Sequence, residues 1–314
     1  MLKYIVKRIG MALATLLVII FVLFVLVRIM PGNPFPSERM SATQIANKRA
    51  EMGLDDPILL QFVRYMKNVL RGDFGKGSSL YNGAPIKTVL SSCVSNSFRI
   101  GGLAILIGTV LGLLLGVCAA LHRGKFLDGF CTVFSIVGVC VPSYVFLIFL
   151  QYNFSYKVSF FPYFFDSSRF LFSAILPALS LSLFTMSTIA RFTRNEMVEV
   201  IDSDYVRLAE SKGMEGRLLI RRHVLRNALV PIVTVLAPLI VDLLTGALVV
   251  EKIYGINGIG KFMVDAIAGE GVDYNYVLAL GILYSSLYIG MMLAVDILYG
   301  ILDPRIRVSA KGEA

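Results

Sequence analysis

The chain has 314 residues, of which 56% are hydrophobic and only 16% are charged. Soluble domains average roughly 45–50% apolar and about 25% charged residues, so this composition excludes an ordinary soluble domain and indicates a protein that folds in lipid. The formal net charge is +9. A basic balance fits either nucleic acid or an anionic membrane surface, and the long uncharged runs favour the membrane over nucleic acid.

Six segments are long and apolar enough to cross a bilayer, because a hydrocarbon core about 30 Å thick takes about 20 residues of helix. They lie at 9–27, 100–121, 130–152, 170–190, 228–250 and 274–300. We therefore predict an all-α membrane protein with six transmembrane helices.

The first segment follows basic residues, as a signal peptide does, but no small-residue cleavage site comes after it. We interpret 1–30 as a retained transmembrane anchor. The other five segments form a transmembrane domain over 94–303, followed by a cytoplasmic tail over 304–314. Lys and Arg concentrate at the N-terminus, in 122–128, in 191–227 and after Asp303, and are few in 153–169 and 251–273. The positive-inside rule then places both termini in the cytoplasm.

An extracytoplasmic region over 31–93 contains one helical pattern. Its apolar positions recur every three or four residues, with basic residues between them: Leu59, Phe62, Val63, Met66, Val69 and Leu70, against Arg64, Lys67 and Arg71. We expect an amphipathic helix that lies on the membrane or on the bundle, and that acts either as a docking platform or as a structural cap.

Three glycines of the second segment, Gly108, Gly112 and Gly116, are spaced by four residues and share one helix face. Such a face lets another backbone approach closely; the alternative is the general abundance of glycine in transmembrane helices. The four cysteines show no metal-ligand spacing, and we expect neither a metal site nor a disulfide framework from them.

The cytoplasmic loop 191–227 is dense in both charges and has internal order. Ser203 is placed to cap a helix that starts at Asp204, carries Tyr205, Leu208 and Ala209 on one stripe, and stops at Gly213. A second helical stretch, 215–226, carries four arginines and continues into the fifth segment. Such a compact unit, joined to a transmembrane helix, suits the transmission of a push from a cytosolic partner. The alternative is a basic loop resting on anionic lipid.

Two runs in this loop, Asp204–Gly213 (DYVRLAESKG) and Arg222–Pro231 (RHVLRNALVP), resemble the coupling-loop signature of the oligopeptide, dipeptide and nickel branch of binding-protein-dependent ABC importer permeases. Ala209 and Gly213 match the Ala and Gly of that signature, whereas Arg207 stands where its general form has an acidic residue. Further runs along the chain look like the first permease subunit of the peptide importers: Met30–Pro34, Gly53–Pro57, Gly72–Gly75, Val250–Gly258 and Leu302–Arg307.

The resemblance implies a type I ABC importer permease fold and a non-catalytic subunit in a bacterial cytoplasmic membrane. It implies a second homologous permease, two cytosolic ATP-binding subunits that hold ATP and magnesium, and an extracytoplasmic peptide-binding protein. This chain itself would bind no cofactor and no metal. The residues implied in coupling to the ATPase are Asp204, Tyr205, Leu208, Ala209, Ser211 and Gly213, braced by Arg222, His223, Arg226 and Asn227.

Gly255, Gly258, Gly260 and Lys261 follow a phosphate-loop pattern up to Phe262, which replaces the Ser or Thr that would hold magnesium. We interpret the three glycines as a turn at an outer gate. Motifs of hydrolytic enzymes are absent from the sequence.

Asp242 lies near the middle of the fifth segment, where a carboxylate is costly unless it faces water or a partner. We expect it to line the translocation path with Thr245; the alternative is a protonated or hydrogen-bonded structural role. Asp296 lies near the cytosolic end of the sixth segment, where we expect it to pair with Arg305 or with backbone.

The resemblance thus implies a permease subunit of an ATP-driven oligopeptide importer, with dipeptide or nickel transport as the alternative cargo. A stand-alone secondary transporter or channel is the rival from another class, but it would use several intramembrane charges, and only Asp242 clearly qualifies.

Overall fold

The structure is a computed structural model that describes residues 2–30, 41, 43–44, 47, 53–77, 84–214, 216–268 and 272–302. Within its helices, the side chains at 2–4, 230, 233–234, 237, 241–242, 244–246, 295 and 298–302 lie outside the description. The described residues form helices and no strand, as the predicted all-α class requires. The predicted tail, 304–314, lies outside the described residues.

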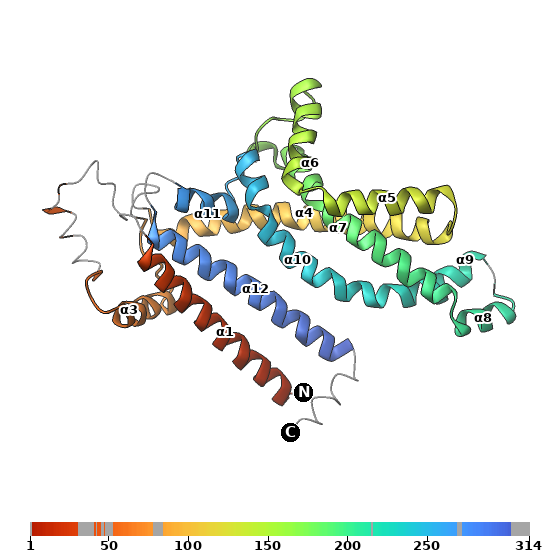
Figure 1. The fold of residues 1–314 in the computed structure, drawn as a ribbon, viewed down its shortest axis with the longest axis horizontal. Helices are drawn as coiled ribbons and strands as arrows, with labels where there is room; N and C mark the ends of the chain where they lie inside the picture. Colours follow the sequence, from red (N-terminus) through yellow and green to blue (C-terminus); the bar gives the residue numbers. More distant parts are fainter. Residues whose placement is uncertain are drawn as a thin grey trace. The chain divides into compact units, whose positions relative to one another are not determined.

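The helices, drawn in Figure 1, are α1 (Leu2–Ile29), α3 (Ile58–Leu70), α4 (Ile86–Leu121), α5 (Phe126–Cys140), α6 (Ser143–Leu150), η3 (Gln151–Lys157), η4 (Ser167–Arg169), α7 (Phe170–Ile201), α8 (Asp204–Ser211), α9 (Gly216–Leu219), η5 (Ile220–Leu225), α10 (Arg226–Tyr254), α11 (Ile259–Ala268) and α12 (Tyr274–Leu302). η3 and η5 are π-helical and η4 is a 3₁₀ turn. The chain divides into two compact units, residues 1–97 with 257–314 and residues 98–256.

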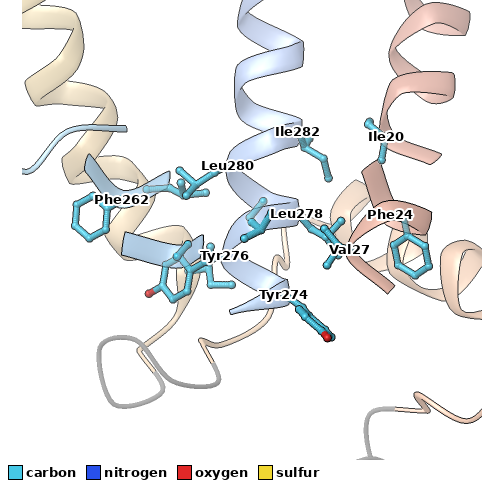
Figure 2. Packing of buried hydrophobic residues seen from close by; sticks show 14 of the residues in the cluster. Ile20, Phe24, Val27, Phe262, Tyr274, Tyr276, Leu278, Leu280 and Ile282 are labelled. Carbon is cyan, nitrogen blue, oxygen red and sulfur yellow. The ribbon is translucent and has the colours of Figure 1, made fainter. Parts of the chain in front are cut away.

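The first unit is built around α1 and α12, which pack side by side. Figure 2 shows Ile20, Phe24 and Val27 of α1 on one side of α12 and Phe262 of α11 on the other. Where the start of α1 lies beside the end of α12, Arg8 Nη1 donates to Asp296 Oδ2 at 2.5 Å. Asp296 therefore pairs with Arg8, a residue of the first helix, whereas the expected partner Arg305 lies outside the described residues.

The predicted amphipathic helix is α3, and its apolar residues divide between two faces. Phe62 is buried and packs edge-to-face on Phe21 and Phe24 of α1, with ring centroids 5.0 and 5.5 Å apart. Leu59 and Val63 remain exposed. The helix therefore packs on α1 with one apolar face and leaves a second one free, which the pattern of apolar positions alone did not separate.

Among the described residues, α1, α4, α7 with η4, and α12 are long and apolar enough to cross a membrane. The third predicted segment is not one straight helix: α5 and the helix from Ser143 to Lys157 are bent by 104°. Pro142 has no N–H to continue the helix, and Val141 before it is extended, as residues before proline usually are. The pair is a broken span or a re-entrant loop, and the six-span count and the orientation stay predictions.

The second unit is built around α7, which packs against α5, α6 and α10. The glycine face of α4 lies against it: a Cβ on Gly112 would be 2.7 Å from the carbonyl oxygen of Met186, and one on Gly116 would be 2.6 Å from that of Ala190. These distances are too short for any side chain, so the close backbone approach predicted from the glycine spacing is confirmed. α10 contains Pro231 and Pro238.

Candidate functional site

The candidate site starts where α7 ends. The sequence places a loop from Arg191 onward, but α7 remains helical through Ile201, so the first eleven residues of the predicted loop prolong a membrane helix. Two residues, Asp202 and Ser203, then connect α7 to α8. Because the connection is so short, α8 is held close to the end of α7.

α8 begins at Asp204, as predicted, with this carboxylate in the first turn, where the helix dipole favours it. The predicted cap is wrong in one respect, because the Ser203 hydroxyl does not accept from the backbone of α8. It donates instead to the Val200 carbonyl oxygen at 2.5 Å. The last carbonyls of a helix lack helical partners, and the end of α7 therefore competes with the start of α8 for this hydroxyl.

The two faces of α8 differ in exposure. Val206 and Ala209 are buried at 3% and 6% exposure, whereas Tyr205 and Leu208 are 46% and 56% exposed. Ala209 was predicted to share a stripe with Tyr205 and Leu208, but it points inward with Val206. A spacing of three residues puts 205 with 208 and 206 with 209, and α8 therefore keeps one apolar pair for its base and another on its free surface.

The base beneath α8 consists of buried apolar side chains from α4, α7, η5 and α10. Val206 belongs to one cluster with Ala120, Met197, Val224 and Ala228. Val224 was not among the predicted residues, although its place in a helical stretch with charged neighbours marks it as the inward position. α8 therefore packs on α7 and on η5, which continues directly into α10.

The segment after α8 returns the chain to α10. Gly213 has φ +84°, a left-handed conformation that favours glycine, and the N–H of Met214 donates to the Ala209 carbonyl oxygen at 3.2 Å. Glu215 lies outside the described residues. The stretch that follows is helical as predicted, but its middle, η5, is π-helical, a form that often marks functional segments.

The predicted bracing residues lie on η5 and the start of α10. Arg222, Arg226 and Asn227 are exposed, His223 is half-buried, and Asn227 donates to the His223 carbonyl oxygen at 2.9 Å. In the described part of the chain, packing onto α8 comes from apolar neighbours and not from hydrogen bonds of these four residues. Their bracing role, like the roles of Asp204, Ser211 and Gly213 in coupling, stays a prediction.

Two ion pairs tie the 122–128 turn to the end of α7. Asp128 is almost fully buried and accepts from Arg194 Nε and Nη2, each at 2.9 Å, and from the N–H of Gly124 at 3.0 Å. Arg123 donates to Asp202 at 2.7 Å at the surface. Sequence patterns do not predict these pairs, because their members are 66 and 79 residues apart.

The opposite end of α10 is closed by hydrogen bonds. Tyr254 is buried; its hydroxyl donates to the Pro162 carbonyl oxygen at 2.6 Å, and its carbonyl oxygen accepts from the N–H of Phe165 at 2.9 Å. Gln151 Nε2 donates to the Tyr163 carbonyl oxygen at 2.6 Å. The loop before α7 is therefore fastened to the end of α10, a feature that the sequence analysis missed.

The loop continues into a short capped turn. Ser168 donates to Asp166 through both its N–H and its hydroxyl, and these hydrogen bonds hold the pKa of the Asp166 carboxyl below its usual value. The turn leads directly into α7.

The remaining predicted residues fall into two groups. Asp242 and Thr245 belong to α10, and their side chains lie outside the description. Gly255 ends α10 with φ +73°, while Gly258 and Gly260 are buried at the start of α11. A helix, α10, precedes this turn where a phosphate loop has a strand, which agrees with the turn interpretation. Path lining and outer gating stay predictions.

Comparison with known proteins places this geometry in a family. Residues 108–308 match the family described as binding-protein-dependent transport system inner membrane component, and residues 1–98 match the N-terminal region of such components. A dipeptide transport system permease protein of Bacillus subtilis is 37% identical over 99% of this chain and its own full length. An oligopeptide transport system permease protein of Salmonella typhimurium is 36% identical over 98% of this chain and its own full length.

A solved structure of an inward-facing methionine ABC transporter has the same fold over 70% of this chain and 99% of its own, with a TM-score of 0.58 and 17% identity. The family match covers most of the chain in both of its parts. The chain therefore belongs to the family of binding-protein-dependent transport system inner membrane components.

Proposed function

We propose that this chain is the permease subunit of a peptide importer in which α8 receives the movement of an ATPase and passes it to α7 and α10. Family membership makes the chain a membrane component of an ABC import system of the bacterial inner membrane, which works with an ATPase and a binding protein. The proposal adds the cargo, the coupling surface and the composition of the assembly.

One observation carries the coupling proposal: α8 exposes Tyr205 and Leu208 while Val206 and Ala209 fix it to its base. Exposed aromatic and aliphatic side chains on a rigid support are typical anchors of protein interfaces. The support is continuous with two long helices, because only Asp202 and Ser203 separate α7 from α8 and because η5, on which α8 packs, runs without a break into α10. A displacement of α8 is therefore transmitted to both helices.

The cargo proposal comes from the relatives, whose names give dipeptides and oligopeptides as what they transport. We propose oligopeptides, with dipeptides as the alternative. Asp242 and Thr245 are proposed to line the path, and Gly255, Gly258 and Gly260 to form an outer gate turn.

We further propose an assembly with a second homologous permease, two ATP-binding subunits that hold ATP and magnesium, and an extracytoplasmic binding protein. In this assembly the present chain has no catalytic residue and binds no cofactor. Its contribution is mechanical, through α8.

The test is transport by the complete complex in proteoliposomes. Uptake of a labelled pentapeptide, a labelled dipeptide and Ni²⁺ is measured with and without ATP, and with the ATPase subunits omitted. The proposal predicts ATP-dependent peptide uptake that disappears without the ATPase subunits. Uptake that persists without them would show a stand-alone transporter, and uptake of Ni²⁺ alone would overturn the peptide cargo.

A further inference from the structure

A cavity of about 240 Å³ opens in the second unit, close to the end that carries α8. It lies between α4, α5 and α7, and its polar lining comes from Thr132, Ser135, Arg191, Arg194 and Asn195. It is smaller than the roughly 300–1,000 Å³ clefts that take drug-sized ligands. Its size suits a compact polar group.

The cavity carries excess positive charge. Arg194 donates through Nε and Nη2 to Asp128 and through one hydrogen of Nη1 to Asn195 Oδ1 at 3.4 Å, so the second hydrogen of Nη1 remains for another acceptor. Arg191 is exposed and forms no ion pair with another described residue. No carboxylate belongs to the lining. One of two guanidinium groups is therefore neutralised by Asp128, and the charge of Arg191 remains available to an anion.

The donors around this charge are of the kind that binds phosphate. A guanidinium presents several N–H groups in a fixed plane, and phosphate accepts from them strongly. The Thr132 hydroxyl and the Asn195 amide add neutral donors on the same wall. The Ser135 hydroxyl is already used, because it donates to the Cys131 carbonyl oxygen at 2.8 Å.

The other walls are apolar and small, formed in part by Ala119 and Ala190. On α5, which supplies three of the lining residues, Ile136 is exposed and lies one turn beyond Thr132 on the same side of the helix. An occupant with an anionic head and an apolar tail would satisfy both surfaces. Basic pockets between transmembrane helices on the cytoplasmic side bind anionic lipid headgroups by this combination.

We infer that this cavity binds the phosphate group of an anionic phospholipid. The headgroup phosphate lies between Arg191 and Arg194 Nη1, and the acyl chains lie along Ile136 of α5. A free phosphate ion shares the head chemistry but not the contact with α5, so an experiment distinguishes these two sources.

The experiment uses the complete detergent-solubilised transporter and acyl-labelled phosphatidylglycerol, with binding followed by fluorescence anisotropy. Acyl-labelled phosphatidylcholine is the neutral-headgroup probe. Arg191→Gln is the test variant, because an exposed side chain without an ion pair can be replaced without loss of the fold. Lys125→Gln is the matched control, since Lys125 is an exposed cation in the 122–128 turn and lies outside the cavity lining.

The expected result is that Arg191→Gln weakens phosphatidylglycerol binding about tenfold, as for loss of one charge-assisted hydrogen-bonding group, whereas Lys125→Gln changes it less than about twofold. Phosphatidylcholine should bind the wild-type transporter no more tightly than phosphatidylglycerol binds the Arg191→Gln variant.

A competition with excess inorganic phosphate separates the two sources of the phosphate group. Failure of the ion to displace the labelled phosphatidylglycerol supports the phospholipid. Full displacement at concentrations that leave Arg191→Gln unaffected assigns the site to free phosphate and overturns the lipid. Equal loss in both variants, or equal binding of both lipids, overturns the site itself.

Discussion

The two ends of the second unit differ in what holds them together and in what they expose. At one end, Tyr254 is buried and its polar groups are satisfied by Pro162 and Phe165 of the loop before α7. At the other end, α8 buries Val206 and Ala209 but leaves Tyr205 and Leu208 in solvent. At the first end the chain satisfies the buried polar groups with its own hydrogen bonds, although Tyr163 and Phe164 beside them are 49% and 60% exposed. At the second end no such hydrogen bonds are needed, because α8 rests on a buried apolar base and exposes an apolar pair. The exposed pair on α8 is the surface at which we propose that the ATPase docks, and no such role is proposed for the buried Tyr254.

The largest effect is expected from a charge on the exposed face of α8. Leu208→Asp should reduce ATP-dependent uptake by roughly thirtyfold or more, because a central apolar anchor contributes about 2 kcal/mol or more to an interface and a buried, unpaired carboxylate adds a further penalty. The measurement is uptake in proteoliposomes together with copurification of the ATPase. The matched control is Leu218→Asp on α9, since Leu218 is 57% exposed against 56% for Leu208. Equal loss in the two variants would remove the distinction between α8 and the rest of the segment.

A smaller effect is expected from the close contact between α4 and α7. Gly112→Val should lower the free energy of unfolding by about 1–3 kcal/mol, because its side chain would push α4 away from the Met186 carbonyl of α7. Thermal unfolding of the purified complex measures the change. Gly102→Val is the control, since a Cβ on Gly102 meets nothing within 4 Å. A wild-type midpoint for Gly112→Val would show that α4 and α7 are not in close contact.

Loss of the ion pair near α8 should have an intermediate effect. Asp128→Asn removes the charge that accepts from Arg194 through two hydrogen bonds, and about 1.5–2 kcal/mol of stability should be lost. Because Asp128 and Arg194 join the 122–128 turn to α7, the loss should appear as faster proteolysis of this turn. Arg123→Gln, which breaks an exposed pair with Asp202, should cost less than about 1 kcal/mol. The reverse order of the two variants would contradict the assignment of Asp128 as the inner support.

The smallest effect is expected at the closed end. Tyr254→Phe removes one hydroxyl but keeps the buried ring, and the Pro162 carbonyl still accepts from the Ser155 hydroxyl at 3.1 Å. We expect a loss of about 0.5–1.5 kcal/mol in stability and no change in ATPase copurification. Loss of the ATPase from Tyr254→Phe would show that the two ends are not independent in the way their packing indicates.

The fold was predicted where a physical pattern is local. Hydropathy located the apolar helices, and the four-residue spacing of Gly112 and Gly116 predicted the contact that the structure places against α7. The early start of α4 at Ile86 was missed because its first turns are rich in Ser and Asn and carry no hydropathy signal. The break at Pro142 has a sequence signal, a proline inside an apolar run, but the length of that run predicts one continuous span.

For the candidate site, the sequence predicts where the α8 helix starts and ends, but not which of its faces is buried. The start at Asp204 and the stop at Gly213 follow from helix-end chemistry within a few residues. The inward turn of Ala209 could not be decided, because an eight-residue helix with apolar residues on two faces fits either orientation until its base is known. The base itself comes from Met197, Val224 and other residues distant in sequence, and only the folded chain brings them together.

The most direct test of the account is a disulfide crosslink from the exposed face of α8. Cys140, which is exposed, is replaced by Ser, and Leu208→Cys or Val206→Cys is introduced into the complete transporter together with single cysteines along the cleft of the ATPase subunit. The account predicts a crosslink from Leu208→Cys whose yield changes when ATP binds, and none from the inward-facing Val206→Cys. Absence of any crosslink from Leu208→Cys, or equal yields from both positions, would contradict the claim that α8 couples through its exposed face.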